Sequence, residues 1–256
     1  MFHDDPSGLA VTLPAPSPRV VEATSWRLSD VIVGSVLLVF GFAATIALGV
    51  GLALRGPIDR TDAMVALLLT VVTLLIEVWA GVIVIGLALS RRISLHDLGF
   101  RPPSSWMFVP LAVFGAYGSI IVYGLVVMAI ERLTGADLAS LRQGNRIPPD
   151  LPRTPLIWGT LGLAVMVAAP FCEELFFRGL IYRGLAGIGG PVLGIIVSGL
   201  AFSAVHANLS VVVPFALIGM TFAWVYRASG SLWPTMVAHA IVNGVSFVYT
   251  LYGVAS

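Results

Sequence analysis

Long apolar runs constrain this chain more than any other feature of its sequence. A run of about 18 or more residues with few charges is long enough to cross a bilayer as a helix. Hydrophobic residues make up 58% of the 256 residues and charged residues only 11%, whereas soluble domains have about 25% charged residues. The sequence therefore excludes a water-soluble fold and predicts an all-α, polytopic membrane helical bundle.

About seven apolar segments are predicted to be transmembrane helices. They are residues 31–54, 63–89, 106–130, 156–185, 191–207, 211–226 and 232–254. The fourth segment is longer than one crossing requires at about 1.5 Å per residue. We expect it to tilt, or to kink at Pro170.

Polar segments divide the chain into four parts. Residues 1–28 are predicted to be a disordered polar tail, because they are rich in proline and have little apolar surface to bury. Residues 29–130 hold three transmembrane helices, with a loop at residues 93–105. Residues 131–154 form an extramembrane linker, and residues 155–254 form a second helical bundle.

The charged residues indicate orientation and exclude one class of partner. Eight of the 14 arginines fall on the side of the N-terminus and six on the other, which favours a cytoplasmic N-terminus by the positive-inside rule. The net charge of +1, without a basic stripe, gives no basis for binding nucleic acid. Membrane lipids are the partners that the apolar helices require.

Three charged residues interrupt the fourth predicted helix, where an ionised side chain costs at least about 2.5–3.5 kcal/mol near the bilayer centre. Glu174 and Arg178 are four residues apart, so they share a helix face and can neutralise each other. Glu173 lies about 100° around the helix and has no such local partner. A structural ion pair would explain Glu174 and Arg178 but not Glu173, which is therefore a candidate for chemistry.

His206 lies at the end of the fifth predicted helix. Glu173 and His206 are each 16.5 residues from the midpoint of Gly189 and Gly190, the expected turn between the two helices. Antiparallel packing would place them at the same depth, where a glutamate and a histidine can form a general-base pair. A histidine buried in the helix core is the alternative.

His239 and Asn243 share a face of the seventh predicted helix. Polar groups in membrane helices often form interhelical hydrogen bonds, so this pair is either a structural clamp or a pair of donors for an oxyanion. Simple counting places His239 and His206 at different depths. A single site requires the sixth helix to be short, tilted or partly unwound, and Pro214 makes this plausible.

Together these residues form three motifs that resemble those of the CPBP family, the CAAX proteases and bacteriocin-processing enzymes also called Abi. The resemblance covers about residues 155 to 250. The motifs are Glu173-Glu174-Leu-Phe-Phe-Arg178, Phe202-Ser-Ala-Val-His206 and His239-Ala-Ile-Val-Asn243.

The resemblance implies an intramembrane glutamic endopeptidase, a hydrolase of a prokaryotic cell membrane. Its substrate would be a membrane-associated peptide or protein, prenylated or otherwise hydrophobic, and no metal or other cofactor is expected. Glu173 with His206 would activate a water, and His239 with Asn243 would stabilise the oxyanion. The supporting residues would be Arg178, which holds Glu174 and shapes the pocket, and Phe202.

Other functions stay open at this point. Glu173, His206 and His239 could form a zinc site with an open position, although the usual HExxH helix is absent. The family also includes immunity and scaffold proteins. A transporter would use Glu77 of the second helix for ion coupling, and a cysteine enzyme would use Cys172, whose thiol projects from a different helix face than Glu173.

Overall fold

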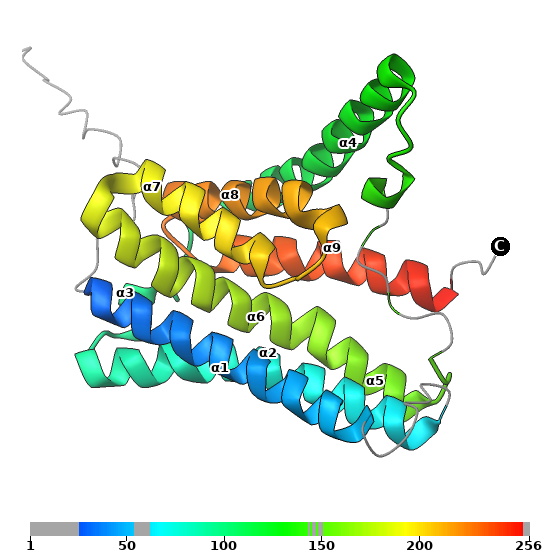
Figure 1. Ribbon diagram of the computed structural model, residues 1–256. Helices are drawn as coiled ribbons and strands as arrows, with labels where there is room; N and C mark the ends of the chain where they lie inside the picture. Colours follow the sequence, from blue (N-terminus) through cyan, green and yellow to red (C-terminus); the bar gives the residue numbers. More distant parts are fainter. Residues whose placement is uncertain (1–25, 54–61, 143, 145–146, 148–150, 253–256) are drawn as a thin grey trace, which may run out of the picture.

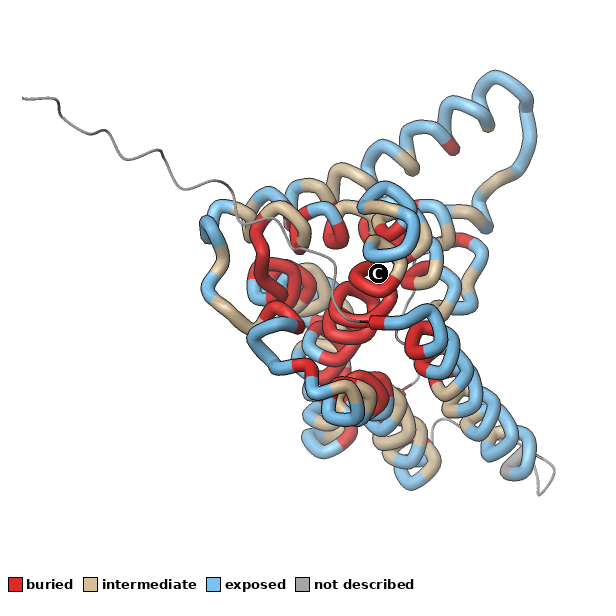
Figure 2. The backbone as a smooth tube through the Cα atoms, turned by 90° about the vertical axis from the view of Figure 1, so that its left-hand side faces the viewer, coloured by how far each residue is buried: buried red, intermediate tan, exposed pale blue. Residues whose placement is uncertain are grey.

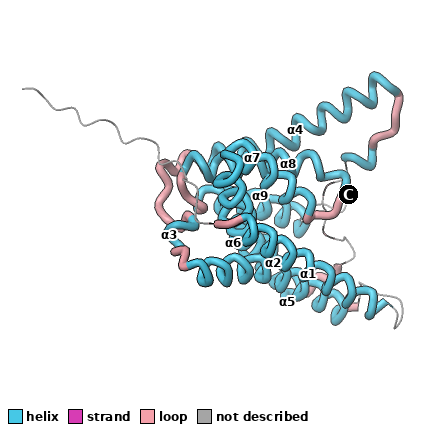
Figure 3. Tube along the Cα trace, turned by 60° about the vertical axis from the view of Figure 1, so that its left-hand side comes forward, coloured by secondary structure: helices cyan, strands magenta, loops and turns pink. Residues whose placement is uncertain are grey.

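The regular secondary structure of the described part of the chain is entirely helical. The computed structural model describes residues 26–53, 62–142, 144, 147 and 151–252, and these residues contain no β-strand. Figure 3 shows long helices joined by short connections, so the predicted all-α bundle is confirmed. Most of the predicted polar tail, residues 1–25, lies outside the described residues.

The N-terminal half forms three long helices, α1 (Leu28–Ala53), α2 (Ala63–Arg91) and α4 (Phe108–Thr134). The side chain of Asp62 caps α2 by accepting hydrogen bonds from two backbone N–H groups of its first turn, which lack partners within the helix. The segment predicted as a loop contains one helical turn, α3 (Leu95–Leu98). The third predicted helix extends to Thr134, into the predicted linker.

The fourth predicted helix is a rod of several segments (Figure 1). The segments are α5 (Pro155–Leu163), the π-helix η2 (Ala164–Ala168), α6 (Ala169–Glu174), the π-helix η3 (Leu175–Tyr182) and the first part of α7 (Arg183–Ala204). The expected kink site, Pro170, lacks the N–H that would extend the regular ladder. The preceding turn is π-helical, with the Ala169 N–H bonded to the Ala164 carbonyl.

The chain reverses at Gly190, inside α7, where φ is 83° and ψ is 168°. A positive φ favours glycine because it has no Cβ. This turn confirms the boundary expected between the fourth and fifth predicted helices. The remaining elements are the short 3₁₀ helices η1 (Ala139–Arg142) and η4 (Leu209–Val211), followed by α8 (Val212–Ser229) and α9 (Trp233–Tyr252).

Within the described residues, five helical stretches are long and apolar enough to cross a membrane. They are Leu28–Gly51, Ala63–Arg91, Phe108–Thr134, Pro155–Ala204 and Leu209–Ser229. The fourth contains both predicted helices that flank Gly190, and α9 corresponds to the seventh. The protein is an integral membrane protein. Buried residues follow the central rod, most of all η3, in which every residue is buried (Figure 2).

Two glycines let α7 and α8 pack closely. A Cβ added at Gly219 of α8 would lie 2.8 Å from the Gly199 Cα of α7 and 3.2 Å from the Phe202 Cβ. Small residues permit such backbone contact between membrane helices.

Gly219→Ala is therefore expected to lower the thermal stability of the purified protein, because overpacking costs about 1–3 kcal/mol. The control is Gly118→Ala in α4, where a Cβ would meet nothing within 4 Å among the described residues. Equal melting temperatures for both variants would show that α7 and α8 are not packed this closely.

Candidate active site

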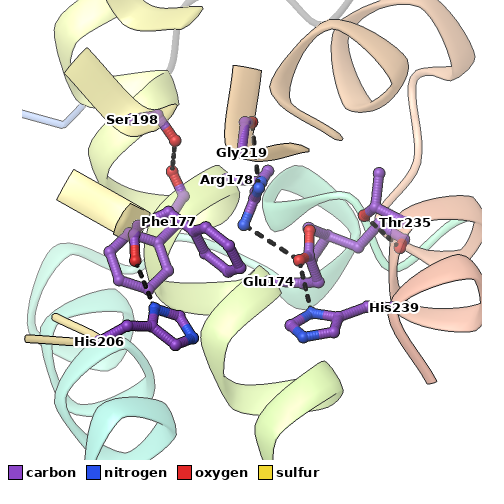
Figure 4. Close-up of polar contacts among 10 residues, drawn as sticks. Glu174, Phe177, Arg178, Ser198, His206, Gly219, Thr235 and His239 are labelled. Atoms are coloured by element: carbon purple, nitrogen blue, oxygen red, sulfur yellow. Dashed lines mark hydrogen bonds and ion pairs between the residues drawn. The ribbon is translucent and has the colours of Figure 1, made fainter. Parts of the chain in front are cut away.

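One oxygen of Glu174 contacts both Arg178 and His239. Its Oε1 accepts a hydrogen bond from Nη1 of Arg178 at 3.0 Å, and Nδ1 of His239 lies 3.0 Å from the same atom (Figure 4). The side chains of Glu174 and Arg178 are both fully buried. The ion pair predicted from the four-residue spacing is confirmed, and it also holds α9 through His239.

Arg178 lies at the centre of the bundle among rings and a carbonyl group. Its Nη2 donates to the Gly219 carbonyl at 3.1 Å. Its guanidinium carbon lies 4.8 Å from the centroid of Phe202 and 5.4 Å from that of Phe222. Such ring faces attract a cation. The buried charge is thus compensated by a carboxylate, a carbonyl and two rings.

Phe202 lies against both histidines. Its ring centroid is 5.1 Å from that of His206 and 5.8 Å from that of His239. Nδ1 of His206 lies 2.8 Å from the Phe202 carbonyl oxygen. Because a carbonyl only accepts hydrogen bonds, Nδ1 of His206 carries a hydrogen, and the same holds for Nδ1 of His239 against an ionised Glu174. Each ring therefore keeps Nε2 for other contacts.

A cavity of about 320 Å³ adjoins these residues. All four predicted catalytic residues line it, although they come from α6, α9 and the turn after α7. Its remaining wall is largely apolar. The polar lining residues are Thr73, Glu77, Glu173, His206, His239, Asn243, Ser246 and Thr250.

Glu173 is buried at this cavity with one oxygen unused. Glu173 is 9% exposed, and its Oε2 has no hydrogen-bond partner among the described residues. Within the described structure, no hydrogen bond joins Glu173 to His206. The expected pair therefore shares a cavity rather than a direct bond, and a water between them would be needed to connect the two groups.

Asn243 also serves a structural purpose. Its Nδ2 donates to the Val165 carbonyl of η2 at 2.9 Å, which is the interhelical clamp considered as an alternative to the oxyanion role. Because an amide NH₂ group carries two hydrogens, one remains for a ligand in the cavity. The Val165 carbonyl, which accepts the other amide hydrogen, belongs to a π-helical turn. Such turns are frequent at functional sites.

One contact and the place of one residue in the site were not predicted from the sequence. The contact between His239 and Glu174 joins residues 65 positions apart, and motif spacing does not predict it. Glu77 of α2 lines the same cavity, and its carboxyl group lies beside that of Glu173. As a lone carboxylate in an apolar helix, Glu77 was considered only for ion coupling in a transporter, because the sequence does not show which helix it faces.

The three residues considered as zinc ligands are not grouped as a metal site in the described structure. Among the residues that the structure describes, no three His, Cys, Asp or Glu side chains are grouped closely enough to hold a metal ion. Glu173, His206 and His239 line one cavity without forming a three-ligand set.

Comparison with known proteins agrees with the motifs. Residues 155–245 match the family model of the Rce1-like type II CAAX prenyl endopeptidases. The C-terminal segment of this chain is therefore similar to the CAAX proteases. The match contains every motif residue of the site, whereas α2 with Glu77 lies outside it.

One curated relative of this segment is the Bacillus subtilis (strain 168) protein named "Putative membrane peptidase YdiL". It is 29% identical over 77 residues, which is 30% of this chain and 32% of the relative. The matched region thus spans about a third of the relative's length. No solved structure gave a significant match.

Proposed function

We propose that the protein is an intramembrane endopeptidase that hydrolyses a membrane-associated or lipidated substrate with a water activated by Glu173 and His206. The observation that carries the proposal is the convergence of Glu173, His206, His239 and Asn243 on one cavity in a membrane bundle. The family of the matched segment supports peptide-bond hydrolysis. A prenylated C-terminal tetrapeptide is the substrate class that the family description favours.

In the proposed mechanism, a water lies between Glu173 and His206. Glu173 takes a proton from the water as the water oxygen bonds to the carbonyl carbon of the scissile peptide. The same proton then passes to the leaving nitrogen as the carbon–nitrogen bond breaks. Because the site is buried, charged groups interact there more strongly than in water.

The developing oxyanion would be stabilised by His239 and Asn243. Nε2 of His239 donates to it when the ring is protonated, while Nδ1 stays bonded to Glu174. The free hydrogen of the Asn243 amide is the second donor. Donors held in place before the reaction stabilise such charge effectively, and both are held, by Glu174 and by the Val165 carbonyl.

The direct test is hydrolysis by the purified protein in detergent. A farnesylated peptide with a C-terminal tetrapeptide is compared with the same peptide lacking the lipid, and products are identified by mass spectrometry. We expect cleavage of the farnesylated peptide. If neither peptide is cleaved, the result favours an immunity or adaptor role for this chain.

Activity is expected to survive dialysis against EDTA and phenanthroline, because a glutamate–histidine pair needs only the correct protonation states. A zinc site would lose its metal to chelators. Elemental analysis should also give far less than one zinc per chain. Activity that vanishes on chelation and returns with Zn²⁺ would instead make His206 and His239 metal ligands.

A further inference from the structure

Glu77 is an ionisable residue that the proposed mechanism does not use. It lies at the midpoint of α2, with residues 63–76 before it and residues 78–91 after it, and no other charged residue precedes Arg91 in this helix. A carboxyl group inside a membrane span is costly and usually functional. The segment that matches the protease family begins at residue 155, so Glu77 is a contribution of the N-terminal half.

Helix α2, which carries Glu77, packs against α6, which carries Glu173 (Figure 1). A Cβ added at Gly81 would lie 2.8 Å from the Cys172 Sγ, so this glycine permits a close approach of the two helices. Gly81 is one turn after Glu77, and Cys172 directly precedes Glu173. The close approach therefore sets the carboxyl group of Glu77 beside that of Glu173 on the wall of the cavity.

Two carboxyl groups in contact at a buried site cannot both be ionised without strong repulsion, so such a pair holds one proton between them. The other titratable groups that interact with Glu77 are Cys172 of α6 and His239 of α9. Arg178, the cation of the site, is bonded to Glu174 rather than to this pair. In the part of the chain that the structure describes, the pair therefore has no bonded cation that would neutralise a second negative charge.

We propose that Glu77 is a positioning residue that shares one proton with Glu173 and orients its carboxylate toward the cavity. The pair begins the reaction with one proton and one negative charge. It gains a second proton from the attacking water and returns that proton to the leaving nitrogen. The sharing of the proton does not depend on turnover, whereas its effect on rate rests on the proposed peptidase function.

Proton sharing is tested by dicyclohexylcarbodiimide, which reacts with protonated carboxyl groups in apolar surroundings. The full-length protein in detergent is treated at neutral pH, and the modified peptides are quantified by mass spectrometry. We expect modification of Glu77 or Glu173 in the wild type. Glu77→Gln should reduce labelling of Glu173, and Glu173→Gln that of Glu77, each by at least about tenfold, since coupled groups interact by more than one pKa unit.

The matched control is Thr73→Val. Thr73 lines the same cavity one turn before Glu77, and its hydroxyl donates to the Leu69 carbonyl of its own helix. This variant should label like the wild type. The proposal is overturned if labelling of each glutamate is unchanged when the other is replaced. It is equally overturned if wild-type labelling appears only below about pH 5, as for ordinary carboxyl groups.

A kinetic comparison separates positioning from a structural role. Glu77→Gln keeps a hydrogen-bond donor for Glu173, whereas Glu77→Leu removes it. We expect kcat to fall by about 10²-fold for Glu77→Leu, with KM and melting temperature little changed, and to recover largely in Glu77→Gln. Equal losses in both variants, or a loss that follows the melting temperature, would contradict this role.

The labelling and cleavage experiments distinguish proton sharing from the peptidase function. Coupled labelling without cleavage of the farnesylated peptide would support proton sharing and refute the peptidase function. Cleavage of the farnesylated peptide without coupled labelling would support the peptidase function and refute proton sharing.

Discussion

Glu173→Gln is expected to reduce kcat for cleavage of the farnesylated peptide by about 10²–10⁴-fold, the usual contribution of a general base. The amide keeps the shape of the side chain and cannot take a proton from water. Because Oε2 of Glu173 has no hydrogen-bond partner in the described structure, little of the fold depends on it. The melting temperature in detergent should therefore stay close to that of the wild type.

Ser246→Ala is the matched control for this variant, because Ser246 lines the same cavity from α9 and has no role in the proposed chemistry. It should retain turnover within a few-fold of the wild type. Near-normal kcat in Glu173→Gln would refute the assignment of Glu173 as the base. Equal losses in both variants would indicate that the cavity tolerates no change at all.

The second large effect is expected for Arg178→Ala, with a loss of about 3–5 kcal/mol of stability because removing one partner strands a buried charge. Among the described residues, Glu174 would keep His239 as its partner, and the Gly219 carbonyl would lose the guanidinium N–H of Arg178. The melting temperature in detergent should fall markedly. Activity should fall as well, because Glu174 also holds His239.

An exposed ion pair provides the comparison for Arg178. Arg142 lies 3.2 Å from Glu131, and its side chain is 47% exposed. Exposed pairs contribute about 0–1 kcal/mol, so Arg142→Ala should hardly change the melting temperature. Similar melting temperatures for the two arginine variants would mean that the Arg178 pair is not buried.

The features that could be predicted from sequence are those set by neighbours along the chain. The pairing of Glu174 with Arg178 follows from helix geometry, and the turn at Gly190 follows from its two glycines. Both are confirmed. The motif order also indicated which helices carry polar residues into the bundle. The catalytic roles of these residues stay predictions.

The features that could not be predicted arise from packing between helices. Helical periodicity shows which residues share a face but not which helix that face contacts. The bond between Glu174 and His239 depends on where α9 crosses α6, and the position of Glu77 depends on the contact between Gly81 and Cys172. For the same reason, the sequence left open whether Asn243 clamps two helices or faces a ligand, and the structure shows its bond to the Val165 carbonyl of η2.

The contact between α2 and α6 has a practical consequence for measuring the motion of these two helices. Cys172 is the single cysteine of the sequence and is buried at this contact, one residue before Glu173. A thiol reagent reaches it when the two helices separate. The rate of maleimide modification of the unaltered protein therefore reports how often the wall of the cavity opens, and acceleration or protection by an added peptide would show whether binding spreads or closes that wall.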